Sequence, residues 1–242
     1  MKIKPDIIHE DESFVIVNKP PRYLAIPDRY EVTKPNVADF LKRKYDEILT
    51  VHRIDKETSG IMVFARNEAA HRELSRQFQE RTVTKIYAAL CDGVFKEKTG
   101  IIDAPLLNNL ASSGKVVVNR SGKPSVTHYE AVEQFRDFAL VEFDLKTGRT
   151  HQIRAHALHI GHPLMTDAIY GRREEFMLSE IMGKRYKSGK NHTERSLLSR
   201  SALHAARLTF RHPTSGETVT FSADLPKDMR AVVAQLRKQN AV

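Results

Sequence analysis

The sequence predicts an α+β fold in which short strands outnumber helices. Three observations carry this prediction. Alternating or β-branched apolar residues recur in short segments along the chain, which is typical of strands. The segments 35–47 and 68–80 have apolar residues at helical spacing. The segments 126–132 and 138–145 follow each other closely, as antiparallel neighbours do. A chain of 242 residues can form one large domain or two intimate lobes.

The amino-terminal part is predicted to form two strands and then a helix. Ile7-Ile8 and the run 14–17 are apolar and flank an acidic turn. Pro20 ends the second strand because proline cannot donate to a strand ladder. Residues 35–47 are predicted to form an amphipathic helix that covers the sheet. Its apolar positions are Val37, Leu41 and Tyr45.

The middle of the chain is predicted to alternate between one helix and several strands. Asn67 can cap a helix from Glu68 to about Glu80. Its buried stripe is expected to comprise Ala70, Leu74 and Phe78. The segment 82–90 is predicted to be a strand because its β-branched residues alternate with polar ones.

Charge and composition favour a nucleic acid as the partner. Lys and Arg number 39 and Asp and Glu 30, so the net charge is +9, which suits a polyanion. The single cysteine, Cys91, allows no disulfide framework and no thiolate metal cluster, and it indicates a reducing compartment. Neither a secretory signal nor an apolar membrane span is apparent. We therefore expect a cytoplasmic protein with no membrane partner.

Residues 51–66 contain a candidate reactive carboxylate. Asp55 lies among His52, Arg53 and Lys56, and neighbouring cations stabilise an ionised carboxylate. Such a group can act as a nucleophile or a base. The residues alone also permit a simpler interpretation, in which Asp55 forms an Asx-type turn ahead of a strand and the basic residues are solvated.

The literal pattern favours the catalytic interpretation. HRIDKETSG at 52–60 resembles the H-R-L-D-x-x-T-S-G signature of the RluA-type pseudouridine synthases, which isomerise uridine in RNA; Ile54 replaces the usual Leu, a volume-conserving change. Asn18-Lys19-Pro20 resembles the family's opening "vNKPxG", although Pro21-Arg22 stands where small residues are common.

Two later blocks extend the resemblance. Residues 81–87 match R-x-V-x-K-x-Y, and residues 147–156 match the block "TGRTHQIRxH". One departure is Thr166, where most relatives carry Gly. The resemblance spans roughly residues 6 to 230, nearly the whole chain.

The resemblance implies a fold and an organisation. The fold is the pseudouridine synthase fold, with a mixed, mainly antiparallel central sheet flanked by helices and loops and a cleft across the sheet. Residues 1–242 are expected to form a single catalytic domain of two intimate subdomains, with a basic insert at about 172–200. The small N-terminal S4-like RNA-binding domain of several relatives is expected to be absent.

The resemblance also implies an activity. It is that of an RNA pseudouridine synthase, a cofactor-independent isomerase acting on specific uridines in ribosomal RNA, transfer RNA or both. The expected partner is an RNA stem-loop, and the protein is expected to be a monomer. The alternative is a catalytically silent RNA-binding or ribosome-assembly protein on the same fold.

Residue roles follow from the matched positions. Asp55 is implied to be the catalytic carboxylate and Arg154 the guanidinium that keeps it ionised and oriented. Tyr87 is implied to stack on the uracil and to take the C5 proton, although a phenol with a pKa near 10 is a poor base. Arg53 is implied to fill the gap left by a flipped uridine. Further RNA contacts are expected from His52, Arg81, Lys85, Arg149, His151, Gln152, Lys184, Arg185, Lys187 and Lys190.

Four histidines in the second half raise the question of a metal site. They are His151, His156, His159 and His162. Imidazole is a common zinc ligand, but no helical i, i+4 pair with an intervening Glu is present. We expect no metal, and we assign these residues to RNA contact and structural hydrogen bonds.

The segment 172–200 is unusually basic. It holds eight Lys or Arg residues against four Glu. The apolar residues Phe176, Met177, Ile181 and Met182 predict a short helix packed on the domain. Residues 183–192 are then expected to form a mobile basic loop that binds RNA phosphates. The alternative is a solvated surface excursion.

Overall fold

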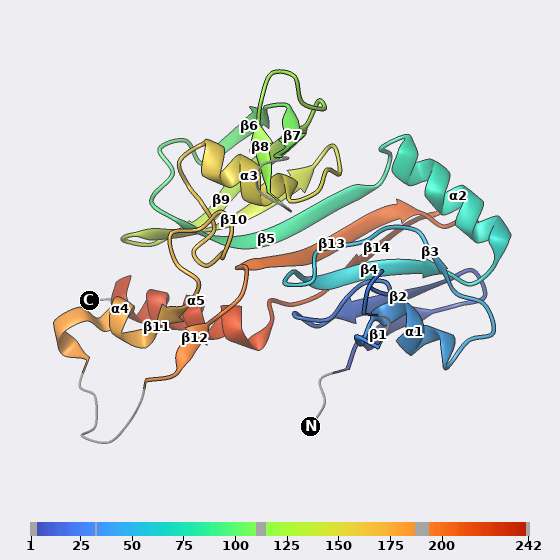
Figure 1. The fold of residues 1–242 in the computed structure, drawn as a ribbon, viewed down its shortest axis with the longest axis horizontal. Helices are drawn as coiled ribbons and strands as arrows, with labels where there is room; N and C mark the ends of the chain where they lie inside the picture. The colour runs from blue at the N-terminus through green and yellow to red at the C-terminus, as the bar shows by residue number, and fades with distance from the viewer. Residues whose placement is uncertain (1–3, 32, 110–114, 187–193, 241–242) are drawn as a thin grey trace. The chain divides into compact units, whose positions relative to one another are not determined.

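A computed structural model describes residues 4–31, 33–109, 115–186 and 194–240 of the chain and shows an α+β fold (Figure 1). The chain divides into two compact units. Unit 1 comprises Met1–Tyr87 with His204–Asp224, and unit 2 comprises Ala88–Leu203 with Leu225–Val242. The strand pairing is mixed and mainly antiparallel. The predicted fold class is therefore confirmed, whereas the predicted cleft stays a prediction.

Unit 1 is built on a sheet whose strands run in the order β1-β2-β4-β13, with β3 beside β4 and β14 beside β13. Its strands are β1 (Asp6–Glu10), β2 (Phe14–Lys19), β3 (Leu49–Thr50), β4 (Ser59–Ala65), β13 (Leu203–Arg211) and β14 (Thr218–Ser222). The pairing of β4 with β13 is parallel, and the others are antiparallel. The two predicted amino-terminal strands are confirmed as β1 and β2.

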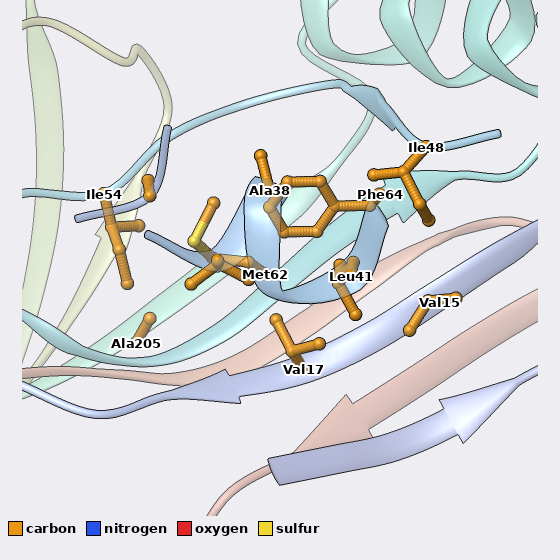
Figure 2. Close-up of a cluster of buried hydrophobic side chains, with 11 residues drawn as sticks. Val15, Val17, Ala38, Leu41, Ile48, Ile54, Met62, Phe64 and Ala205 are labelled. Carbon is orange, nitrogen blue, oxygen red and sulfur yellow. The ribbon is translucent and has the colours of Figure 1, made fainter. Parts of the chain in front are cut away.

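Both faces of this sheet are covered, which explains its continuous apolar runs. Alternate residues of β2 and β4 pack on α1 (Val37–Lys42) on one face (Figure 2) and on α2 (Glu68–Gln79) on the other. The α1 face includes Val15, Val17, Met62 and Phe64. The α2 face includes Phe14, Ile16, Ile61 and Val63.

Helix α2 follows the prediction. The side chain of Asn67 accepts the N–H of Ala70 at 2.8 Å, which satisfies a donor that the first turn leaves unpaired. Ala70 and Leu74 are buried as expected, and Phe78 is partly buried.

Helix α1 is shorter than the predicted segment 35–47. It is capped by the side chain of Asn36 and ends before Arg43. The Leu41 carbonyl oxygen accepts the N–H groups of both Lys44 and Tyr45, so the chain leaves the helix in a tight turn. The Tyr45 hydroxyl then donates to Glu10 in β1, and this tertiary contact replaces a further helical turn.

Unit 2 contains the strand order β5-β10-β9-β6. These are β5 (Thr84–Asp92), which begins in unit 1, β6 (Thr99–Asp103), β9 (Val126–Gln134) and β10 (Phe138–Leu145). The predicted strands at 82–90, 126–132 and 138–145 are confirmed within two residues. A small hairpin of β7 (Leu106–Asn108) and β8 (Val116–Val118) follows β6. The helices α3 (Gln152–His159) and α5 (Lys227–Asn240) were not predicted.

The basic segment 172–200 is more ordered than expected where it is described. It contains β11 (Phe176–Met177), α4 (Leu178–Met182), the 3-10 helix η1 (Gly183–Arg185) and β12 (Ser196–Leu198). The short helix is confirmed as α4, which contains Ile181 and Met182, whereas Phe176 and Met177 form β11, and the antiparallel β11–β12 pair was missed. The prediction of a loop from residue 183 is wrong for Gly183–Arg185. Lys187 and Lys190 lie outside the described residues.

No helix among the residues that the structure describes is both long and apolar enough to cross a membrane.

Candidate active site

Asp55 lies in the irregular segment between β3 and β4, beside a residue of the core. Ile54 is 6% exposed and belongs to the cluster that packs α1 on the sheet (Figure 2). Asp55 itself is half-buried, and its carbonyl oxygen accepts the N–H of Thr58 at 3.2 Å. The carboxylate is thus carried by a short turn whose preceding side chain is fixed in the core.

The buried ammonium of Lys19 also holds the segment of Asp55. Lys19 is fully buried, and its Nζ donates to the carbonyl oxygens of Pro20 (3.0 Å), Tyr23 (2.7 Å) and Lys56 (3.0 Å). A buried ammonium is tolerated only when its donors are used in this way. The ammonium of Lys19 therefore holds the turn after β2 and the residue after Asp55 together. Sequence reasoning missed this role, although Lys19 lies in a matched block.

The Ser-Gly pair of the signature has a steric explanation. Ser59 and Gly60 pair in parallel with His204 and Ala205. The Ser59 Oγ lies 2.9 Å from His204 Nδ1, and His204 Nε2 lies 3.2 Å from the Ala223 carbonyl oxygen, so Nε2 donates and Nδ1 accepts the hydroxyl proton. Gly60 has φ +114°, and a Cβ there would lie 2.2 Å from the Ala205 oxygen.

Tyr87 lies close to Asp55 within unit 1. It is half-buried and packs against the core cluster that contains Ile54. Burial, and then the negative charge of Asp55, raise the pKa of Tyr87 above its ordinary value. Tyr87 is therefore a neutral phenol at pH 7. It can stack on a base or donate a hydrogen bond, but it is poorly suited to take the C5 proton.

The expectation that His52 is one of the cations beside Asp55 is wrong. Its Nε2 accepts the N–H of Val63 at 3.1 Å, and its ring stacks on Phe78 with the centroids 4.7 Å apart. Burial, and then the charge of Lys85, lower the pKa of His52 to about 3. The ring is neutral at pH 7 and serves the packing of unit 1.

The other basic residues predicted in unit 1 divide into buried and exposed ones. Lys85 is 9% exposed, and its Nζ donates to the Val83 carbonyl oxygen at 3.4 Å, so its burial argues against the predicted RNA contact. Arg53 and Arg81 are exposed, as phosphate contact requires.

Three basic residues have left-handed backbones. Among the described residues, the non-glycine residues with positive φ are Arg22 (62°), Arg81 (60°) and His151 (53°). Each lies in or beside a block that carried the family resemblance. This conformation costs a residue with a Cβ about 1–2 kcal/mol. At Arg22 it also shows that the turn after β2 keeps a glycine-like backbone although no glycine is present.

In unit 2, Arg154 forms a buried bidentate ion pair with Asp167. Arg154 is 6% exposed, its Nε lies 2.6 Å from Oδ2 and its Nη2 lies 2.8 Å from Oδ1. Burial alone would raise the pKa of Asp167, but the hydrogen bonds and charge of Arg154 hold it below its ordinary value. The sequence predicted Asp55 as the partner of Arg154 and missed Asp167, although that aspartate lies in the matched region.

A family model described as RNA pseudouridylate synthase matches residues 13–159, more than half of the chain. The chain belongs to the RNA pseudouridylate synthase family. Its activity is that of an RNA pseudouridine synthase.

Curated relatives and solved structures agree with this family. An uncharacterized RNA pseudouridine synthase of Bacillus subtilis is 38% identical over 241 residues, which cover 96% of this chain and 73% of that protein. Ribosomal large subunit pseudouridine synthase D of Neisseria meningitidis serogroup B is 38% identical over 240 residues, covering 96% of this chain and 61% of the relative. The structure of human RNA pseudouridylate synthase domain containing 4 has a TM-score of 0.73 at 25% identity, with 96% and 92% of the two chains covered.

In this pseudouridine synthase, Gln152 is buried and hydrogen-bonded within unit 2, which argues against the predicted RNA contact. It is 2% exposed. Its Oε1 accepts from the Thr147 hydroxyl (2.8 Å) and the Arg149 N–H (2.9 Å), and its Nε2 donates to the Val126 carbonyl oxygen (3.0 Å) and to Thr127 Oγ1 (2.9 Å). A buried amide with these partners holds the turn that carries Arg149, which is itself half-buried.

The four histidines serve separate purposes. His151 Nδ1 lies 3.1 Å from the Tyr170 hydroxyl, and His162 Nδ1 lies 2.9 Å from the Asp92 carbonyl oxygen. His156 is fully buried between Thr127 and Ala104, and burial lowers its pKa. His159 is exposed. Within the described ranges, no group of three His, Cys, Asp or Glu side chains is arranged to hold a metal ion.

Of the basic residues predicted in the segment 172–200, Arg185 is exposed at the end of η1. Lys184 lies in the same 3-10 helix.

Proposed function

We propose that this pseudouridine synthase modifies ribosomal RNA of the large subunit, with Asp55 as its catalytic carboxylate. The relatives named ribosomal large subunit pseudouridine synthase D, at 34–38% identity over nearly the whole chain, support the substrate. The observation that supports the catalytic role is the set of contacts that hold the segment of Asp55 in place. Ile54 in the core and the ammonium of Lys19 hold its segment, and Tyr87 lies near it.

The reaction reattaches the uracil to its ribose through a different atom and leaves the composition of the RNA unchanged. The N1–C1′ bond of uridine breaks, the uracil turns, and a C5–C1′ bond forms. C5 loses its proton and N1 gains one, so the product is an isomer and no oxidant or reductant takes part. A carboxylate at Asp55 can attack C1′, attack C6 or remove the C2′ proton, and all three routes keep this balance.

The supporting residues have distinct proposed roles. Arg154, whose guanidinium Asp167 holds within unit 2, is the proposed orienting partner of the Asp55 carboxylate. Tyr87 stacks on the extruded uracil as a neutral phenol. Arg53, which is exposed, occupies the gap that the flipped uridine leaves. None of these roles needs a metal, so EDTA is expected to leave activity unchanged.

The test of the carboxylate is Asp55→Asn, which removes the charge and keeps the shape. Pseudouridine formation in a large-subunit ribosomal RNA transcript is expected to disappear, while RNA affinity stays within about twofold. Asp46→Asn, at an exposed aspartate of the same unit, is the control and should be as active as the wild type. Turnover of Asp55→Asn within tenfold of the wild type would overturn the assignment. Modification of transfer RNA and not of ribosomal RNA would overturn the substrate.

We further propose that the two units are subdomains of one catalytic domain, which acts as a monomer in the cytoplasm. Cys91 is a free, buried cysteine, which agrees with a reducing compartment. Sedimentation equilibrium of the purified chain tests the monomer. A concentration-dependent mass near twice 27.6 kDa would contradict it.

A further inference from the structure

Arg22 occupies a backbone position that a glycine would fill without strain. It lies in the turn after β2, where the family pattern has small residues, and its φ is 62°. Glycine adopts this conformation at no steric cost, whereas arginine does not. The turn itself therefore gives no reason for an arginine. The reason has to lie in the side chain.

The turn is attached to the segment of Asp55, which determines where this side chain begins. Lys19 Nζ holds the carbonyl oxygen of Tyr23, the residue after Arg22, and that of Lys56, the residue after Asp55. The Arg22 Nε lies 3.8 Å from Glu57 Oε2, two residues beyond Asp55. The guanidinium is thus positioned beside the segment of the catalytic carboxylate.

The ion pair between Arg22 and Glu57 contributes little to stability. Arg22 is 60% exposed and Glu57 36% exposed, and ion pairs between such exposed groups stabilise a fold only weakly. A planar guanidinium that is open to solvent can instead bind a phosphate through two parallel hydrogen bonds. A nucleotide whose ribose reaches Asp55 carries a phosphate on each side, so its backbone passes close to this position.

We propose that Arg22 binds an RNA phosphate next to the target uridine and that Glu57 holds the guanidinium in place until the phosphate replaces it. The inference rests on the proposed role of Asp55, because that role brings the target nucleotide to this segment. It adds to the enzyme a contact that the family pattern does not contain.

The test compares three variants in RNA binding and in stability. Arg22→Gly removes the guanidinium and relieves the backbone, so it should melt at or above the wild-type temperature and yet bind the ribosomal RNA transcript about tenfold more weakly at 100 mM salt. Its plot of log affinity against log salt should be shallower by about 0.7–0.9, the value for one phosphate contact. Arg22→Ala keeps the strained backbone, so it should show the same loss of binding as Arg22→Gly but melt at a lower temperature than Arg22→Gly. Glu57→Gln removes the competing anion and should bind about twofold to fivefold more tightly.

The outcomes separate this inference from the proposed function. If the wild type forms pseudouridine and Arg22→Gly keeps both the affinity and the salt slope, Arg22 has no phosphate contact and the inference fails alone. If Arg22→Gly loses stability in proportion to its loss of binding, the side chain is structural and the inference also fails. If Asp55→Asn stays active, the proposed role of Asp55 fails, whatever the salt slopes are.

Discussion

Replacing Gly60 by alanine tests how the signature is attached to the sheet. The new Cβ would lie 2.2 Å from the Ala205 oxygen, 2.6 Å from its nitrogen and 2.8 Å from its carbonyl carbon. All three are backbone atoms of β13, so no side chain can move aside. To restore a normal contact, β4 and β13 must separate by roughly 1 Å, because packed heavy atoms stay at least about 3.4–3.5 Å apart.

The cost can be estimated from its parts. A positive φ costs alanine about 1–2 kcal/mol relative to glycine. Separation of the strands also weakens the buried hydrogen bond between Ser59 and His204, and an unpaired buried partner costs about 1–3 kcal/mol. We expect Gly60→Ala to lower the free energy of unfolding by about 2–5 kcal/mol, the sum of these two costs. Activity should fall too, because the strand begins four residues after Asp55.

Gly161→Ala is the matched control. Gly161 has φ +84°, but a Cβ there would meet no atom within 4 Å. It should therefore show only the backbone cost, about 1–2 kcal/mol. Urea unfolding followed by far-ultraviolet circular dichroism, with the slope m checked for each variant, measures both. A difference of less than about 1 kcal/mol between the two variants would refute the steric argument.

Three further predictions concern the surroundings of Asp55 and the basic segment. Lys19→Met leaves three carbonyl oxygens without their donor, so it should cost about 2–4 kcal/mol of stability and lower the single-turnover rate at saturating RNA at least about tenfold; a wild-type rate would show that Lys19 does not position Asp55. The pKa of His52 is about 3 in the fold and 6.5 in the unfolded chain, so its contribution to stability is complete above pH 6.5 and is lost as pH falls toward 3. His52→Gln keeps an acceptor for the Val63 N–H but does not titrate, so between pH 6 and 4 its unfolding free energy should change by about 1.4 kcal/mol per pH unit less than that of the wild type, and equal slopes would contradict the assignment. A variant of the basic segment neutralises Lys184, Arg185, Lys187 and Lys190 together. It should bind RNA more weakly and with a flatter salt dependence, while the single-turnover rate at saturating RNA stays unchanged. An unchanged salt slope would show that the segment is a solvated surface excursion.

Elements formed by neighbours in the chain were predictable. The strands β1 and β2, the capped helix α2 and the β9–β10 pair each depend on a pattern within one short segment. Apolar alternation and an Asn cap act over a few residues, so they can be recognised without knowing the rest of the fold. The family and its activity were also recognisable, because the family's sequence motifs are present almost unchanged in this chain.

Elements stabilised by specific buried polar contacts were not predictable. Helix α3 is buried from Gln152 to Ala157 although its sequence contains the polar residues Gln152, Arg154 and His156. These side chains can be buried because each forms hydrogen bonds with a partner distant in the sequence. An apolar stripe is the signal for a helix in a sequence, and this helix has none.

The sequence by itself determined the family of this protein and a set of candidate side chains, whereas the tertiary structure decided which state and which partner each side chain has. The sequence around His52 predicts a cation, whereas in the fold its ring accepts from Val63 and stacks on Phe78. The sequence predicts Asp55 as the partner of Arg154, whereas the fold places Asp167 against its guanidinium. Ser59 and His204 are 145 residues apart and meet only through the parallel pairing of β4 with β13. A charge state depends on burial and on neighbours brought together from distant parts of the chain, and these exist only once the chain has folded.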